Sequence, residues 1–257
     1  MEIVVISAAA LIVSCLTFFS GFGLGTILMP VFLLFFPVDV AIALTAIVHF
    51  LNNILKTVIL FKNARWNIVF RFGVPAFIAA FFGAKALFSL ERLPALYAYS
   101  FFGRDALITP VKLALAFLMV LFAVVELVPS LGKITFSSRF LLPGGIVSGF
   151  FGGLSGHQGA LRSMFLLKCG LSKENFIATG VIIACLVDFS RIAVYWGNVM
   201  KTSYEQYLSL MICAVLSAFM GVFVGSRLMK KVTMKTIQII VTVMLFMIAV
   251  FLGAGVI

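Results

Sequence analysis

The sequence predicts an all-α polytopic membrane protein built from two inverted repeats of about five segments each, with a short half-helix or re-entrant segment in each half. Of its 257 residues, 63% are hydrophobic and only 11% are charged. A soluble fold of this length cannot bury so much apolar surface, so the solvent is predicted to be lipid. The apolar residues form long runs instead of alternating with polar ones, which favours membrane helices over barrel strands.

Ten apolar segments follow one another along the chain, and one helical crossing of the hydrocarbon core needs about 20 residues. Segments 26–36 and 159–168 are too short to cross comfortably, so half-helices or re-entrant pieces are expected there. The first segment has an acidic start at Glu2 and leads into further spans, so we expect a retained helix and not a signal peptide. The ten expected segments are 3–20, 26–36, 40–61, 67–88, 107–129, 140–155, 159–168, 174–197, 206–228 and 236–255.

An internal repeat is indicated by two glycine-rich breaks, GFGLG at 21–25 and GGLSGHQG at 152–159, each of which precedes a short segment. Aligning Gly25 with Gly159 brings Thr45 onto Thr179. Further along, PAFIAAFFGAKAL at 75–87 resembles SAFMGVFVGSRLM at 217–229 and pairs Gly83 with Gly225. We therefore predict two homologous transmembrane repeats, residues 1–129 and residues 130–257.

The loop charges predict the orientation of these repeats. Because short cytoplasmic loops retain Lys and Arg, the basic connections are expected inside and the remaining connections, with both termini, outside. This orientation also accounts for the net charge of +11, and no nucleic acid partner is expected. Five segments per half make the second half enter the membrane from the opposite side. Transporters of this design bind substrate near the midplane, where helices are broken. The basic connections hold Lys62 and Arg65, Lys133 and Arg139, Lys168 and Lys173, and Arg227, Lys230, Lys231 and Lys235.

The connection from Leu90 to Ala106 mixes aromatic residues with Arg92 and Arg104. This mixture is typical of an interfacial helix at the outer headgroup region, and we predict one here. An ordinary aromatic belt is the alternative interpretation.

The two glycine-rich breaks are the first candidate binding elements. Gly23, Gly25 and Gly159 permit sharp turns and let a ligand approach the backbone. Each break exposes the first amides of the short helix that follows it, and such amides attract anions. Thr26 lies in the first turn of the helix after the first break. Close packing of small residues between helices is the alternative interpretation of such glycines.

Three polar side chains mark the second break. Arg162 lies in the first turn of the short helix after Gly159, and a guanidinium within a membrane is costly unless it binds an oxyanion or a partner. His157 and Gln158, at the apex of the break, can donate to an oxyanion oxygen, and the histidine also suits proton coupling. The alternatives are that Arg162 extends its charged end to the interface or pairs structurally, and that His157 is structural.

The third segment carries a polar stripe in which Thr45, His49, Asn52, Asn53 and Lys56 recur at spacings of three and four residues. Such a stripe must face protein or water, so it is interpreted as part of a substrate or proton path. Polar contacts that only hold helices together are the alternative. At the matching positions of the second half, only Thr179 recurs.

Asp188 and Arg191 are one helical turn apart in the eighth segment and are expected to form an ion pair. A gating or coupling role and a purely structural bridge both remain open for this pair. The four cysteines have no metal-ligand spacing, so they are interpreted as small core residues, and no metal and no cofactor are expected.

The motifs of both halves resemble the sulfite exporter TauE/SafE family, also described as the toluene sulfonate uptake permease group. The resemblance is carried by GFGLGTILMP at 21–30 with AIALT at 41–45, and by GLSGHQGALRSMFLL at 153–167 with FIATG at 176–180. It covers nearly the whole chain and implies a transporter of sulfite or small organosulfur anions in the bacterial inner membrane. Met164 in place of a second proline, and the interruption of the glycines by His157 and Gln158, leave the exact substrate open.

Export of a small anion by alternating access is the function we expect, with the lipid bilayer and the anion as partners and the homodimer as one option for assembly. The alternatives are transport of another small solute, either a carboxylate or a cation, and a non-catalytic membrane scaffold. An enzyme is not expected, because the chain has only two histidines and eight acidic residues, most of them at segment ends.

Overall fold

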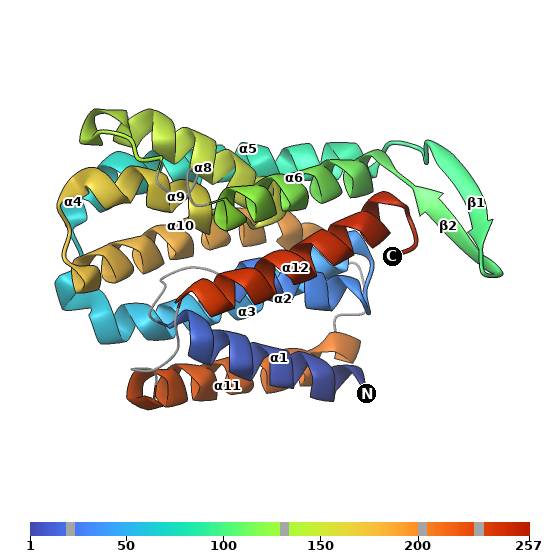
Figure 1. Cartoon of the computed structure of the whole chain (residues 1–257), viewed down its shortest axis with the longest axis horizontal. Helices are drawn as coiled ribbons and strands as arrows, with labels where there is room; N and C mark the ends of the chain where they lie inside the picture. The colour runs from blue at the N-terminus through green and yellow to red at the C-terminus, as the bar shows by residue number, and fades with distance from the viewer. Residues whose placement is uncertain (19–23, 129–133, 200–204, 229–233) are drawn as a thin grey trace.

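The structure is a computed structural model that describes residues 1–18, 24–128, 134–199, 205–228 and 234–257. Within these residues the helices run roughly along one axis, and one β-hairpin projects from an end of the bundle (Figure 1). Among the described residues, four helices are long and apolar enough to cross a membrane, and shorter apolar helices accompany them. The prediction of an all-α polytopic membrane protein is confirmed.

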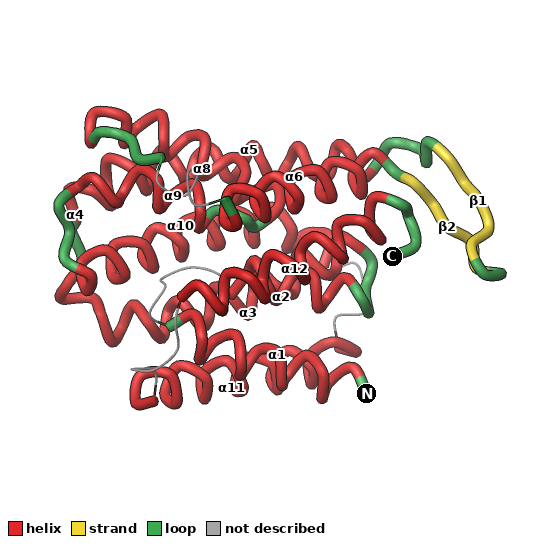
Figure 2. The backbone as a smooth tube through the Cα atoms, viewed as in Figure 1, coloured by secondary structure: helices red, strands yellow, loops and turns green. Residues whose placement is uncertain are grey.

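The first predicted repeat folds into helices that match the expected segments. Figure 2 shows the helices of the chain in red. The longest uninterrupted element is α3, and the turn η2 is a π-helical stretch that runs directly into α5. Thr109 caps α6 by accepting a hydrogen bond from the backbone N–H of Lys112 at 3.3 Å. The elements are α1 (Glu2–Thr17), α2 (Leu24–Leu33), α3 (Val38–Leu60), η1 (Phe61–Asn63), α4 (Trp66–Ile68), η2 (Val69–Gly73), α5 (Val74–Glu91) and α6 (Pro110–Leu127).

The second predicted repeat contains the same succession of short and long helices. Its first helix, α8, ends at Gly156, whose φ of 79° lies in the left-handed region that glycine adopts without strain. The elements are η3 (Ser138–Phe140), α8 (Leu141–Ser155), α9 (Gly159–Leu166), η4 (Leu167–Cys169), α10 (Lys173–Val199), α11 (Glu205–Leu228) and α12 (Met234–Gly253).

The prediction of an interfacial helix between Leu90 and Ala106 is wrong, because this connection forms a β-hairpin. Strands β1 (Tyr97–Phe101) and β2 (Arg104–Ile108) pair in antiparallel register. The hairpin turns at Phe102 and Gly103, with φ values of 50° and 75°, and two positive φ angles are what a tight two-residue turn requires. The C-terminus is fastened to this hairpin, since the hydroxyl of Tyr99 donates to the carbonyl of Ala254 at 2.7 Å.

The long helices pair across the two predicted repeats. Helix α1 packs against α11, and α8 packs against α5, on opposite sides of the bundle (Figure 1). Between them, α3 packs against α10 and α6 packs against α12. The pairing with α1 is close enough that a Cβ added at Gly225 of α11 would lie 2.7 Å from the carbonyl oxygen of Cys15. Each side of the bundle therefore combines early elements of one predicted repeat with late elements of the other.

The short helices lie towards different ends of the bundle. Helix α9 lies towards the end that carries α4, whereas α2 lies towards the end that carries the hairpin and both termini (Figure 1). Every residue of α2 is buried. The larger apolar core surrounds α2 and reaches α1, α3, α6, α11 and α12, while a smaller one joins η2, α5, α8, α9 and α10. Both short helices are thus enclosed by protein.

Candidate functional site

A buried carboxylate, Asp188 of α10, is the centre of the candidate site. Its Oδ2 lies 2.6 Å from Nδ1 of His49 on α3. Its Oδ1 accepts a hydrogen bond from Nε of Arg191 at 3.1 Å, which confirms the predicted ion pair one turn along α10. Asp188 is fully buried and Arg191 is 1% exposed. The cluster joins helices from the two predicted repeats at the place where α3 and α10 pack together.

The partners of His49 determine which ring nitrogen carries a proton in the neutral ring. Because Nδ1 faces a carboxylate, we assign the N–H to Nδ1, which then donates to Asp188. Nε2 is left to accept from Nδ2 of Asn53, which lies 3.3 Å away on the next turn of α3. His49 and Asn53, both predicted to belong to a substrate or proton path, are thus brought together, while the contact with Asp188 was not predicted.

The start of α2 and the second glycine-rich break both border this cluster. A Cβ added at Gly25, in the first turn of α2, would lie 3.4 Å from Cδ2 of His49. A Cβ added at Gly156 would lie 2.6 Å from Nη1 of Arg191. A row of contacts therefore runs from Gly25 of α2 through His49, Asp188 and Arg191 to Gly156 of the second break.

The second break contains buried polar atoms that lack a hydrogen-bond partner. His157 is 3% exposed, its Nδ1 lies 3.0 Å from the carbonyl oxygen of Ser155, and its Nε2 has no partner. The ring stacks on Phe122 with centroids 5.7 Å apart, which fixes its orientation. Nε2 of Gln158 also has no partner, and neither does Nη2 of Arg191, which lies 3.1 Å from Asp188 but outside hydrogen-bonding direction. Buried polar atoms without hydrogen-bond partners are rare, and an ion, water or ligand commonly supplies the missing contact.

Arg162 brings a second buried guanidinium to the region. It is 4% exposed, and its Nη1 donates to Oε1 of Gln158 at 3.4 Å. Its Nε would lie 3.4 Å from a Cβ added at Gly180 of α10, and its charge is attracted by that of Asp188. Asp188 therefore interacts with two buried guanidiniums, those of Arg191 and Arg162.

The comparison with known protein families agrees with this geometry. The sequence profile of the Sulfite exporter TauE/SafE family matches residues 6–252. The chain belongs to this family. Comparison with curated proteins and with solved structures gave no match.

Membership of the TauE/SafE family makes the chain a membrane transporter of sulfite or related anions and not, in general terms, an enzyme. Together with the apolar helices, it places the chain in the cell inner membrane as a multi-pass protein. The structure describes no group of three or more His, Cys, Asp or Glu residues that could hold a metal ion within its described ranges.

The remaining predicted site residues of this TauE/SafE transporter lie around the cluster or outside the described residues. Gly159 begins α9, and Thr26 is buried in the first turn of α2. Gly23 lies outside the described residues. Thr45 is buried one turn before His49 and donates to the carbonyl of Ala41 at 2.7 Å.

Thr179, the predicted counterpart of Thr45, makes a different contact. Its hydroxyl accepts a hydrogen bond from the backbone N–H of Arg65 at 3.0 Å, and so it holds the connection that follows α3. Thr179 precedes Asp188 by nine residues on α10, which corresponds to about 13 Å along a helix axis. The two threonines are therefore not brought to one point in this conformation.

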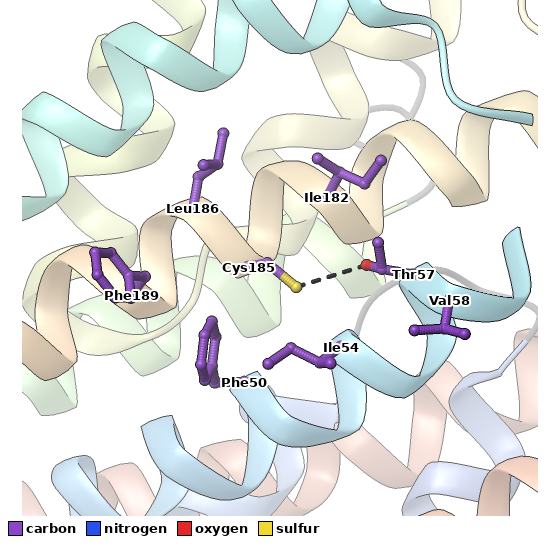
Figure 3. Close-up of a pocket in the computed structure, with 8 residues that line it drawn as sticks. All are labelled: Phe50, Ile54, Thr57, Val58, Ile182, Cys185, Leu186 and Phe189. Atoms are coloured by element: carbon purple, nitrogen blue, oxygen red, sulfur yellow. Dashed lines mark hydrogen bonds between the residues drawn. The ribbon is translucent and has the colours of Figure 1, made fainter. Parts of the chain in front are cut away.

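An apolar groove lies beside the charged cluster, along the seam between α3 and α10 (Figure 3). Its volume is about 320 Å³, and Oγ1 of Thr57 and Sγ of Cys185 meet across it at 3.7 Å. Val58 and Phe189, which line it, are 73% and 56% exposed, as expected of side chains that face lipid. The groove is lined by Phe50, Ile54, Thr57 and Val58 of α3 and by Ile182, Cys185, Leu186 and Phe189 of α10.

Proposed function

We propose that the chain exports sulfite or a small organosulfur anion by alternating access, and that the anion binds beside Asp188. The gathering of two buried guanidiniums at one place is the observation that carries this proposal. Arg162 and Arg191 are both almost fully buried, and both interact with the carboxylate of Asp188. Buried guanidiniums within a membrane protein mark candidate substrate paths, and the guanidinium is the side chain best suited to bind an oxyanion.

The donors around the cluster suit an oxyanion. Arginine binds oxyanions through a fork of N–H groups, and Nη2 of Arg191 and Nε2 of Gln158 have no hydrogen-bond partner. The first turns of α2 and α9 add amides and the positive ends of helix dipoles, with Gly25, Thr26 and Gly159 at these positions. Sulfite and sulfonates offer three oxygens to such a set of donors.

Two inverted repeats, residues 1–129 and 130–257, are part of the proposal. The exchange of partners between α1 with α11 and α8 with α5 supports this arrangement. So does the close packing of the predicted counterparts Gly83 and Gly225, which approach the backbones of α8 and α1 respectively. In repeats of this kind the substrate lies where broken helices meet, and here the start of α2 and the second break border the Asp188 cluster.

Alternating access would change the contacts of the residues that bridge the repeats. We propose that Asp188, Arg191 and His49 hold the present conformation, and that Thr45 and Thr179 become available to the anion after the helices move. In the present conformation their hydroxyls bond to the backbone of Ala41 and Arg65. His157 would complete the lining of the path with its free Nε2.

The membrane potential is sufficient to drive export. Moving one charge across a potential of 100 mV changes its free energy by about 2.3 kcal/mol. For an anion that leaves a negative-inside cell this change is favourable, so export needs no coupling ion. Proton coupling is a second candidate mechanism, because the 2.6 Å contact between His49 and Asp188 joins two groups that can take up a proton.

Transport of labelled sulfite in proteoliposomes tests the proposal through Arg162→Ala. Loss of a charge-assisted contact to the anion of about 1.5–3 kcal/mol predicts a decrease of roughly tenfold or more in kcat/KM. Arg139→Ala is the matched control, because Arg139 is exposed and lies before α8. A normal rate for Arg162→Ala would remove this residue from the site, and faster transport of acetate than of sulfite would favour the carboxylate alternative.

A further inference from the structure

A buried lysine lies on α3, the helix of His49, but apart from the Asp188 cluster. Lys56 follows His49 by seven residues on α3, which places the two about 10 Å apart along the helix axis. It is 3% exposed. The proposed function does not use this ammonium group, although a buried charge within a membrane protein needs a reason.

Lys56 donates to an amide on its own helix, and that amide connects three helices. The amide of Asn52 satisfies all of its neighbours when its oxygen faces Lys56, and we assign it in this orientation. Oδ1 then accepts from Nζ of Lys56 at 3.3 Å, while Nδ2 lies 3.1 Å from Oγ of Ser14 on α1 and 3.3 Å from the carbonyl of Ala218 on α11. The lysine is therefore held by a neutral amide that itself connects α3 with α1 and α11.

The charge of Lys56 has no counter-charge among the described side chains. Both ion pairs found there involve Asp188, and Asn52, which accepts from Nζ of Lys56, is uncharged. An apolar side chain of similar size would pack at this position without the cost of a buried charge. The position therefore offers a positive charge that packing does not explain.

Lys56 lies on α3 between the Asp188 cluster and one end of the bundle. Helix α3 ends at Leu60, and the exposed Lys62 follows in η1. Going from this end towards the Asp188 cluster, the buried polar residues of α3 are Lys56, Asn53, Asn52 and His49. An anion that moves along α3 would meet Lys56 before it reaches His49.

We infer that Lys56 and Asn52 form a second binding position for the transported oxyanion, between the Lys62 end of the bundle and the Asp188 cluster. This inference rests on the proposed function. The ammonium supplies a point charge for the same small oxyanion class, and the amide of Asn52 turns to donate to it. Two separate positions help an anion to leave the central site, since conduction requires several sites of moderate affinity.

Sidedness of transport tests this position. Labelled sulfite is presented to right-side-out and inside-out membrane vesicles that contain the full chain or the Lys56→Met variant. We expect the KM for sulfite at the Lys62 face to rise about tenfold in Lys56→Met, as for a lost charge-assisted contact, and the KM at the opposite face to stay within about twofold. Lys56→Arg keeps the charge and should retain most of the affinity.

Matched variants separate this inference from a structural effect. Lys62→Met, at an exposed position just beyond α3, should leave KM unchanged at both faces. The melting temperature of Lys56→Met should equal or exceed that of the unmodified chain, because an uncompensated buried charge is removed. A lower melting temperature with a parallel loss of transport at both faces would show a structural role and overturn the inference.

The outcomes also separate the inference from the proposed function. Wild-type KM values at both faces for Lys56→Met, together with impaired transport by Arg162→Ala, would reject the second position and keep the central site. Failure of the unmodified chain to carry sulfite at all would reject the proposed function. An equal rise in KM at both faces would assign Lys56 to the central site and overturn the separate position.

Discussion

At the scale of single residues, Asp188 joins the two predicted repeats through its side-chain contacts. One carboxylate accepts from Arg191 on its own helix and contacts His49 on α3. Each of these groups would be costly to bury alone, so each depends on the others. The cluster is for this reason a contact that must be kept for the present conformation, and the proposed function also makes it a binding element for the anion.

Replacing Asp188 by Asn should destabilise the protein strongly. The change removes the only carboxylate that pairs with Arg191 in the described part of the chain, and the loss of one partner of a buried ion pair costs about 3–5 kcal/mol. Unfolding in detergent, followed by tryptophan fluorescence, measures the effect. Glu2→Gln, at an exposed position in the first turn of α1, is the control and should unfold as the unmodified chain does. Equal stability of the two variants would contradict the buried ion pair.

The sequence predicted part of this site. The spacing of Asp188 and Arg191 predicted their ion pair. The second glycine-rich break drew attention to His157 and Gln158, which are buried in the structure. The partner of His49 could not be predicted, because helical periodicity gives the face on which a residue lies and not the helix that it faces. The hydrogen bond of Thr179 could not be predicted either, because its donor, the backbone N–H of Arg65, lies in a connection between helices.

At the scale of the elements, glycines determine how closely the helices approach. Gly145, Gly149 and Gly153 recur every fourth residue of α8, and a Cβ added at any of them would collide with the backbone of η2 or α5. Lipid gives helices no hydrophobic reason to associate, so close contact of small residues supplies the packing energy. The same contact recurs between α11 and α1 at Gly221 and Gly225.

Substitution of Gly149 should disrupt the packing of α8 on α5. In Gly149→Leu the new side chain meets the backbone of Ala76, and overpacking of this kind costs about 1–3 kcal/mol or more. The melting temperature in detergent is expected to fall, and sulfite transport with it. Ile146→Leu serves as the control, since Ile146 lies on the same helix and is 47% exposed. A melting temperature unchanged by Gly149→Leu would show that the two helices can separate without loss.

The hairpin is the element that the sequence analysis missed, and its signal was present. Tyr97, Tyr99 and Phe101 alternate with smaller residues, which is the period of a strand, and Phe102–Gly103 supplies the turn. The mixture of aromatic and basic residues favours an interfacial helix by composition alone, whereas the alternation of large and small residues indicates strands. A strand pair so short is stabilised here by its contact with the C-terminus, including the bond from the N–H of Leu107 to the carbonyl of Gly255 at 3.0 Å.

At the scale of the whole molecule, α3 and α10 form the seam between the predicted repeats. Their charged contacts lie on one side of the seam and the apolar groove on the other. Alternating access requires the two sides of a transporter to move relative to each other. The seam is the place where such movement would be detected.

Cross-linking across this seam should stop transport. Oγ1 of Thr57 and Sγ of Cys185 are 3.7 Å apart, so Thr57→Cys places two thiols within reach of a disulfide bond. The variant also carries Cys15→Ala, Cys169→Ala and Cys213→Ala. Oxidation should reduce sulfite transport at least about tenfold, and reduction with dithiothreitol should restore it.

The same background without Thr57→Cys is the control for the cross-link, and oxidant should leave its transport unchanged. Full transport by the oxidised variant, with the disulfide bond verified by thiol labelling, would show that α3 and α10 do not separate during the cycle.

The positions of the helices could be read from the sequence, whereas their pairing could not. Long apolar runs are a strong signal, and the expected segments agree closely with helices such as α3 and α10. Nothing in the run from Glu2 to Thr17 indicates that its partner is α11, because apolar faces in lipid do not identify their neighbours. The internal repeat nevertheless predicted that Gly83 and Gly225 would correspond, and both lie at close helix contacts.

The pairing of α1 with α11 has a consequence for the synthesis of the protein. Helix α1 is translated before α2, α3, α5 and α10, yet the helix against which it packs, α11, follows all of them. Until then the surface around Cys15, against which Gly225 packs, is open to lipid or to insertion factors. Nascent chains that stop before Glu205 should therefore leave α1 without its native neighbour, however completely α3, α5 and α10 have assembled.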